Sequence, residues 1–143
     1  MHPEGEVKMV RLRYAEAIDY LLESLPQIQQ YYSKRSAQLY ADKNPHVVYG
    51  SILVEFLNEF AREVTGPTRE IADSILKAAF RTIEALSASN DFELRYLVKT
   101  SVLEGLLGEK GGLESFAPFM HHETKKLARE LAETWGLDTR ILS

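Results

Sequence analysis

Apolar residues recur at spacings of three and four along most of this chain, and this periodicity constrains its fold more than any other feature. The pattern begins with Val7, Val10, Tyr14, Ile18 and Leu21 and resumes after each break. Such spacing places apolar side chains on one face of an α-helix. Strict alternation of apolar and polar residues, the mark of a half-buried strand, is not found outside these blocks. The sequence therefore predicts an all-α fold.

Prolines, glycines and short polar stretches separate the periodic blocks. Asn44 precedes a proline and is therefore expected to end a helical path rather than continue one. We expect a single-domain bundle of five or six helices in antiparallel pairs, with packing that can resemble a helical repeat. The predicted helices cover residues 6–23, 25–41, 45–64, 68–87, 91–107 and 121–135, and a short helical piece covers residues 113–120.

The helix predicted at residues 91–107 differs from the others because apolar residues surround much of its circumference. Phe92, Tyr96, Leu97 and Leu103 fall on different sides of it. A helix that is apolar on most sides usually lies at the centre of a domain. We therefore expect this helix to be the most buried one, with Leu97 and Leu103 in the core.

Size and composition limit the class of protein. With 143 residues, 45% of them hydrophobic and 27% charged, the chain suits one globular domain over residues 1–143, with a flexible tail at residues 1–5. It contains no cysteine, which excludes disulfides, thiolate metal sites and cysteine nucleophiles. The net charge of −4 disfavours nucleic-acid binding.

No apolar stretch is long enough to span a membrane and the N-terminus does not resemble a signal peptide, so we expect a cytoplasmic protein.

Motifs for metal binding, phosphate binding and nucleophilic catalysis are absent from the sequence. No Glu-x-x-His pair occurs, and the glycines near residue 110 match no phosphate-binding loop. A Ser51–His46 pair can be drawn, but the sequence offers no third member of a triad. We therefore expect no catalytic residues, no metal and no cofactor, and a carboxylate enzyme is the least favoured alternative.

An acidic strip on the helix predicted at residues 45–64 is the first candidate site. Glu55, Glu59 and Glu63 follow each other at spacings of four, which aligns their carboxylates on one side of the helix, and Arg62 only partly offsets their repulsion. The strip is either a solvated face or a docking surface for a basic protein partner.

Tyrosines gather at the corner between the second and third predicted helices. Tyr31, Tyr32, Tyr40 and Tyr49 lie there, with His46 between the last two. Tyrosine is favoured at interfaces because it brings a large contact area with few rotatable bonds. We take His46 and Tyr49 as candidate binding residues; alternatively, the rings only fill the edge of the bundle.

Two segments carry a resemblance to a known family. Residues 44–50 read Asn-Pro-His-Val-Val-Tyr-Gly, and residues 91–106 form the apolar helix described above. Together they resemble a family of small bacterial all-α proteins of uncharacterised function, over about residues 20–136. Some relatives of that family look like immunity proteins of contact-dependent or polymorphic toxin systems. This chain has Gly105 where relatives carry an asparagine, and the resemblance implies no catalytic residues.

Taken together, the sequence favours a non-enzymatic protein-binding domain, specifically an immunity-type protein that neutralises a partner toxin. The alternative is a helical scaffold or regulatory interaction protein. A protein partner is expected, basic if the acidic strip binds it, while nucleic acid and membrane are not expected. Both a monomer and a homodimer fit the sequence.

Overall fold

The computed structural model describes residues 12–39 and 44–143, and 80% of the structure is helical. The described residues contain no strand, which confirms the predicted all-α class. The predicted flexible tail, the start of the first predicted helix and Tyr40 lie outside the described residues. Within these residues, no helix is long and apolar enough to cross a membrane.

The described residues form seven helices, not five or six, because the short piece before the last helix is a helix of its own. Several helices join α, 3-10 and π turns end to end. The first two are η1 (Tyr14–Glu16) with α2 (Ala17–Ser24), and η2 (Pro26–Ile28) with α3 (Gln29–Leu39). The third joins α4 (Pro45–Val47), the π-helical η3 (Val48–Leu53) and α5 (Val54–Glu63), and the fourth is α6 (Arg69–Ser87). The fifth joins α7 (Phe92–Leu97), the π-helical η4 (Val98–Leu103) and α8 (Glu104–Leu107). The last two are α9 (Gly112–Phe116) with η5 (Ala117–Phe119), and α10 (His122–Thr134), which the short η6 (Arg140–Leu142) follows.

Local signals account for the helix boundaries. The side chain of Asn44 accepts hydrogen bonds from the backbone at the start of α4, as an N-cap residue does. Asp91, rather than its neighbour Asn90, caps α7 by accepting from the backbone N–H of Glu93 at 2.9 Å. Gly136 has a φ of 75°, which glycine adopts without strain, and it ends the path of α10.

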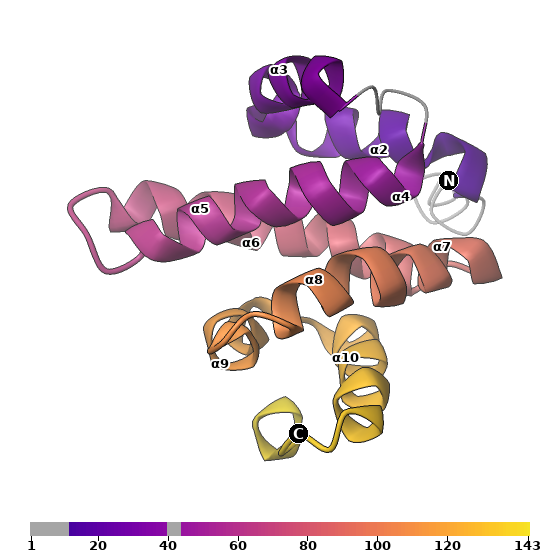
Figure 1. Cartoon of the computed structure of the whole chain (residues 1–143), viewed down its shortest axis with the longest axis vertical. Helices are drawn as coiled ribbons and strands as arrows, with labels where there is room; N and C mark the ends of the chain where they lie inside the picture. Colours follow the sequence, from indigo (N-terminus) through magenta and orange to yellow (C-terminus); the bar gives the residue numbers. More distant parts are fainter. Residues whose placement is uncertain (1–11, 40–43) are drawn as a thin grey trace, which may run out of the picture.

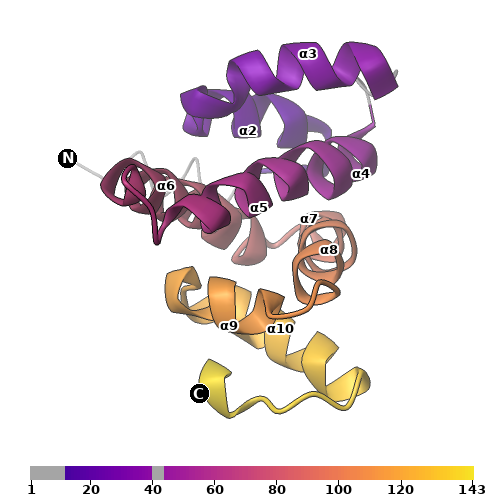
Figure 2. The same ribbon diagram turned by 60° about the vertical axis from the view of Figure 1, so that its left-hand side comes forward.

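The helices stack along the long axis of the molecule in the order of the chain (Figure 1). The pair α2 and α3 lies at one end, α5 and α6 follow, and α9 and α10 lie at the other end beyond α7 and α8 (Figures 1 and 2). Elements that are close in sequence are therefore close in space. Short connections between successive helices account for this arrangement.

The most buried helix is α6, which corrects the prediction made for residues 91–107. Ten of the nineteen residues of α6 are buried, because it packs against α2, α5, α7 and α10. The helix at 92–107 buries seven of its sixteen residues. Its Phe92 and Tyr96 are 66% and 50% exposed, so one of its sides faces solvent. The predicted burial of Leu97 and Leu103 is confirmed.

The third helix (α4, η3 and α5) and the fifth helix (α7, η4 and α8) run in the same general direction and approach each other closely (Figure 1). A side chain at Gly50 would place its Cβ 3.3 Å from the carbonyl oxygen of Ser101, and one at Gly105 would place its Cβ 3.0 Å from a methyl of Val54. The contact brings the π-helical segments η3 and η4 together.

A carboxylate from α6 caps α10 across the fold. The Glu84 side chain accepts three hydrogen bonds of 2.9 Å, from the backbone N–H of Glu123 and from the N–H and hydroxyl of Thr124. His121 stands at the N-cap position but makes no side-chain cap of its own. A carboxylate at a helix N-terminus also interacts favourably with the helix dipole. Glu84 therefore fixes where α10 begins and holds it against α6.

Candidate functional site

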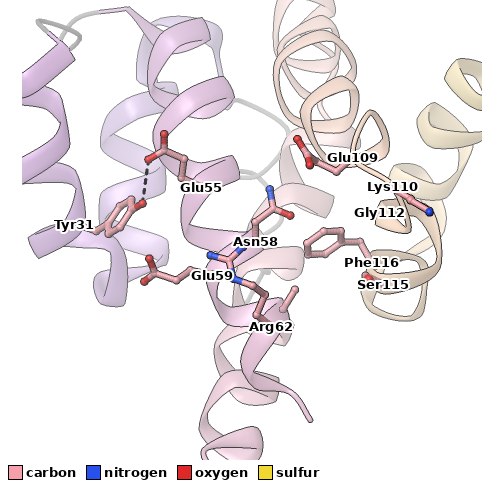
Figure 3. Close-up of a pocket in the computed structure, with 11 residues that line it drawn as sticks. Tyr31, Glu55, Asn58, Glu59, Arg62, Glu109, Lys110, Gly112, Ser115 and Phe116 are labelled. Atoms are coloured by element: carbon pink, nitrogen blue, oxygen red, sulfur yellow. Dashed lines mark hydrogen bonds between the residues drawn. The ribbon is translucent and has the colours of Figure 1, made fainter. Parts of the chain in front are cut away.

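A cleft of about 580 Å³ opens between α5 and the segment that leads into α9 (Figure 3). One wall is the polar side of α5, and the facing wall comes from residues 109–116. Tyr31 of α3 lines one end. The charged residues that line it are Glu55, Glu59, Arg62, Glu109 and Lys110.

The apolar side of α5 fixes the orientation of its polar side. Val54, Phe56 and Leu57 are buried, so α5 cannot rotate without exposing them. Glu55 and Glu59 are four residues apart and therefore point to the same side. The backbone of this wall is thus held in place by the core, which reduces the ordering cost of binding.

Glu55 is already compensated by its neighbours within the fold. Arg35 donates two parallel hydrogen bonds of 3.0 Å, one to each carboxylate oxygen, and the Tyr31 hydroxyl donates a third of 3.1 Å. The hydrogen bonds from Arg35 hold the pKa of Glu55 below its usual value, and Tyr31 contributes to the same shift. Burial raises the pKa of Tyr31, and its bond to Glu55 raises it further.

The other four charged residues of the cleft, Glu59, Arg62, Glu109 and Lys110, are not compensated in this way. All four are exposed, and none forms a salt bridge with another residue of the described chain. Figure 3 shows Glu59 and Arg62 on the α5 side of the cleft and Glu109 on the other side. The cleft therefore carries charges of both signs that a ligand can pair with.

A second hollow, of about 400 Å³, lies between α3 and α5 and adjoins the cleft. The two hollows share Tyr31 and Glu59 as lining residues. The half-buried rings of Phe60 and Tyr31 form its floor, and the buried Phe56 lies beneath them, 4.8 Å from Phe60 and 5.7 Å from Tyr31 between ring centroids. An apolar surface therefore lies next to the charged cleft.

The structure divides the predicted acidic strip. Glu55 and Glu59 line the cleft, while Glu63 does not and instead accepts a hydrogen bond of 3.2 Å from the Thr68 hydroxyl. Arg35, from another helix, neutralises the first of the three carboxylates. The strip is therefore less acidic than its sequence indicates.

The other two candidate binding residues lie away from the cleft. His46 is half-buried, and its Nδ1 lies 2.6 Å from the hydroxyl oxygen of Ser101, not of Ser51. Tyr49 is fully buried, and its hydroxyl donates a hydrogen bond of 2.6 Å to the carbonyl of Ala17. Burial also raises the pKa of Tyr49. Tyr49 is therefore a core residue, and the prediction that it belongs to a binding surface is wrong.

Sequence reasoning missed one whole wall of the cleft. Glu109 and Phe116 lie beside α5 only because the chain folds back after α8, and no local pattern signals that approach. The glycines near residue 110 were tested only against phosphate-binding loops, which they do not match. The described residues contain no group of three or more His, Asp or Glu side chains that could hold a metal ion.

The protein is a small all-helical domain, and an open cleft lined by charges of both signs lies on its surface. The chain belongs to the family described as a domain of unknown function, DUF7674, whose model matches residues 18–136. The resemblance to an uncharacterised family is thereby confirmed. No curated protein and no solved structure matches the chain.

Proposed function

We propose that this chain is a non-enzymatic protein-binding domain that docks a partner in the cleft between α5 and residues 109–116. The observation that supports this most is the presence of Glu59, Arg62 and Glu109 in the cleft without ion-pair partners in the described chain. A partner that pairs with them gains complementary charge at little cost in ordering α5.

A protein fits this cleft better than a small molecule does. Small-molecule sites are concave and mostly apolar, and they bury most of the ligand surface. This cleft is open and lined mainly by polar groups, with an aromatic hollow beside it. Charged groups around aromatic anchors are typical of protein interfaces.

The finer proposal is that the partner is a toxin and that the domain neutralises it by occupying its surface. The resemblance to immunity proteins supports this, and it implies binding without catalysis. The net charge of −4 favours encounter with a basic protein over long distances. The sequence contains no motif for metal binding, phosphate binding or nucleophilic catalysis, which favours binding over an enzymatic role.

Affinity capture from the native host tests the proposal. Tagged wild-type chain is compared with Glu59→Lys and with Glu133→Lys, a matched charge reversal at an exposed position of α10. We expect a partner that the wild type and Glu133→Lys retain and Glu59→Lys loses, while all three proteins keep the same helical circular-dichroism spectrum. If Glu59→Lys captured every host protein that the wild type captures, and in equal amounts, the proposed site would be refuted.

The toxin proposal needs a second assay with the captured partner. The partner is expressed in a sensitive host with and without this chain, and growth is measured. We expect rescue by the wild type and by Glu133→Lys but not by Glu59→Lys. A captured partner that is harmless when expressed alone would refute the toxin proposal and leave the binding proposal intact.

A further inference from the structure

We infer that the partner enters this site as an extended polypeptide segment that carries a basic and an acidic side chain close together, with an apolar side chain beside them. This inference rests on the proposed function and specifies the chemistry of the segment that is bound. The charges of the cleft predict the two opposite charges of the segment. The shape of the site predicts its extended form, and the aromatic rings beside the cleft predict its apolar side chain.

The charge pattern excludes a segment of uniform sign. A purely basic segment can pair with Glu59 and Glu109 but places a cation against Arg62, which lines the same cleft. A purely acidic segment pairs with Arg62 and Lys110 but is repelled by the two carboxylates. Glu55 contributes little attraction because Arg35 already compensates it. Only a segment with both signs pairs with the charges that the fold leaves uncompensated.

The shape of the site favours an extended segment. Tyr31 and Glu59 line both the cleft and the hollow between α3 and α5, so a segment that runs along α5 can contact both; we call the two hollows together the groove. The half-buried rings of Phe60 and Tyr31, which pack on the buried Phe56, form an aromatic floor at the α3 end of this groove. An apolar side chain of the partner that packs on this floor lies next to Glu59, and therefore next to the basic residue that Glu59 binds.

Swapping two opposite charges tests whether binding depends on where the charges lie in the cleft or only on the net charge of the chain. Glu59→Arg with Arg62→Glu keeps the net charge of the chain and reverses the pattern at the cleft. The matched control is Asp73→Lys with Lys77→Asp, which swaps an ion pair of 2.9 Å between solvent-facing side chains of α6. If only net charge mattered, both swaps would leave binding unchanged.

The probe is a phage-displayed library of random peptides of about twelve residues, selected on the immobilised full-length chain. Enriched peptides are synthesised, and their affinity is measured by fluorescence anisotropy. We expect peptides with an acidic and a basic residue close together beside an apolar one. The cleft swap should weaken them at least tenfold, and the α6 swap should change their affinity less than about twofold. Their affinity should fall as salt is raised, because the attraction between the paired charges is screened.

Three results would overturn the inference: enriched peptides of one charge sign, equal binding to the wild type and the cleft swap, or no peptide enriched on the wild type over the swap. If the cleft swap does not fold, as judged by its melting curve, Glu59→Gln with Arg62→Gln replaces it, and the same loss is expected. Cleft-dependent capture with no such peptide refutes this inference alone. Peptide binding at the cleft without any captured partner refutes the proposed cellular function alone.

Discussion

Replacing Gly105 with alanine tests how tightly the third helix, which contains α5, packs against the fifth helix, which contains α8. A Cβ at this position would lie 3.0 and 3.2 Å from the two methyl groups of Val54. Valine is stiff in a helix, and Val54 is only 7% exposed, so its side chain has little room to move away. The helices must separate slightly, and the contact between Gly50 and Ser101 resists that separation.

Two opposing effects set the size of the change. Alanine in place of glycine inside a helix gains about 0.5–1 kcal/mol, while an extra methyl in a well-packed contact costs about 1–3 kcal/mol. We expect a net loss of about 1 kcal/mol. For a chain of this length, that loss lowers Tm by roughly 2–6 °C.

Urea unfolding measured in two backgrounds provides the assay. In the wild-type background, Gly105→Ala should lower the free energy of unfolding. In the Val54→Ala background, where the two methyls are gone, the same change should raise it by about 0.5–1 kcal/mol, because only the helix-propensity gain remains. A stabilising effect of Gly105→Ala in both backgrounds would refute the close contact.

Three further changes test the core, the cap of α10 and the compensated carboxylate. Leu97→Ala should cost about 2–5 kcal/mol in urea unfolding, as expected for a fully buried leucine. Glu84→Gln should cost roughly 1–2 kcal/mol because a carboxylate that caps α10 is lost, whereas Glu133→Gln should leave stability unchanged. Glu55 has a lowered pKa, so it stabilises the fold above its unfolded pKa, and this contribution fades as the pH falls through the folded value. Glu55→Gln should therefore lower Tm at pH 7 and reduce the further loss of Tm on acidification; an unchanged pH profile would show that Arg35 does not hold this carboxylate.

Helical periodicity was sufficient to locate the helices because each one buries a continuous apolar face. The predicted bounds 45–64 and 68–87 differ by one residue at most from the observed bounds, Pro45–Glu63 and Arg69–Ser87. Proline and glycine marked the breaks for local steric reasons. The extra helix at Gly112–Phe119 was underestimated because it is short and contains a proline.

Contacts between distant residues could not be predicted in this way. Arg35 and Glu55 are twenty residues apart, and only the packing of α3 against the third helix brings them together. Tyr49 looked like a surface residue because its hydroxyl is polar, yet the carbonyl of Ala17 accepts its hydrogen bond inside the core. Burial of a polar group depends on such a partner, and the partner's position is a property of the tertiary fold.

Hydrogen–deuterium exchange with the captured partner tests most directly whether the cleft is the binding site. The full-length chain is measured alone and in the complex, and protection is mapped by residue. We predict increased protection in residues 55–62 of α5 and in residues 109–116, which form the two walls of the cleft. Protection confined to the exposed aromatic side of α7, at Phe92 and Tyr96, with none in the cleft, would contradict this assignment.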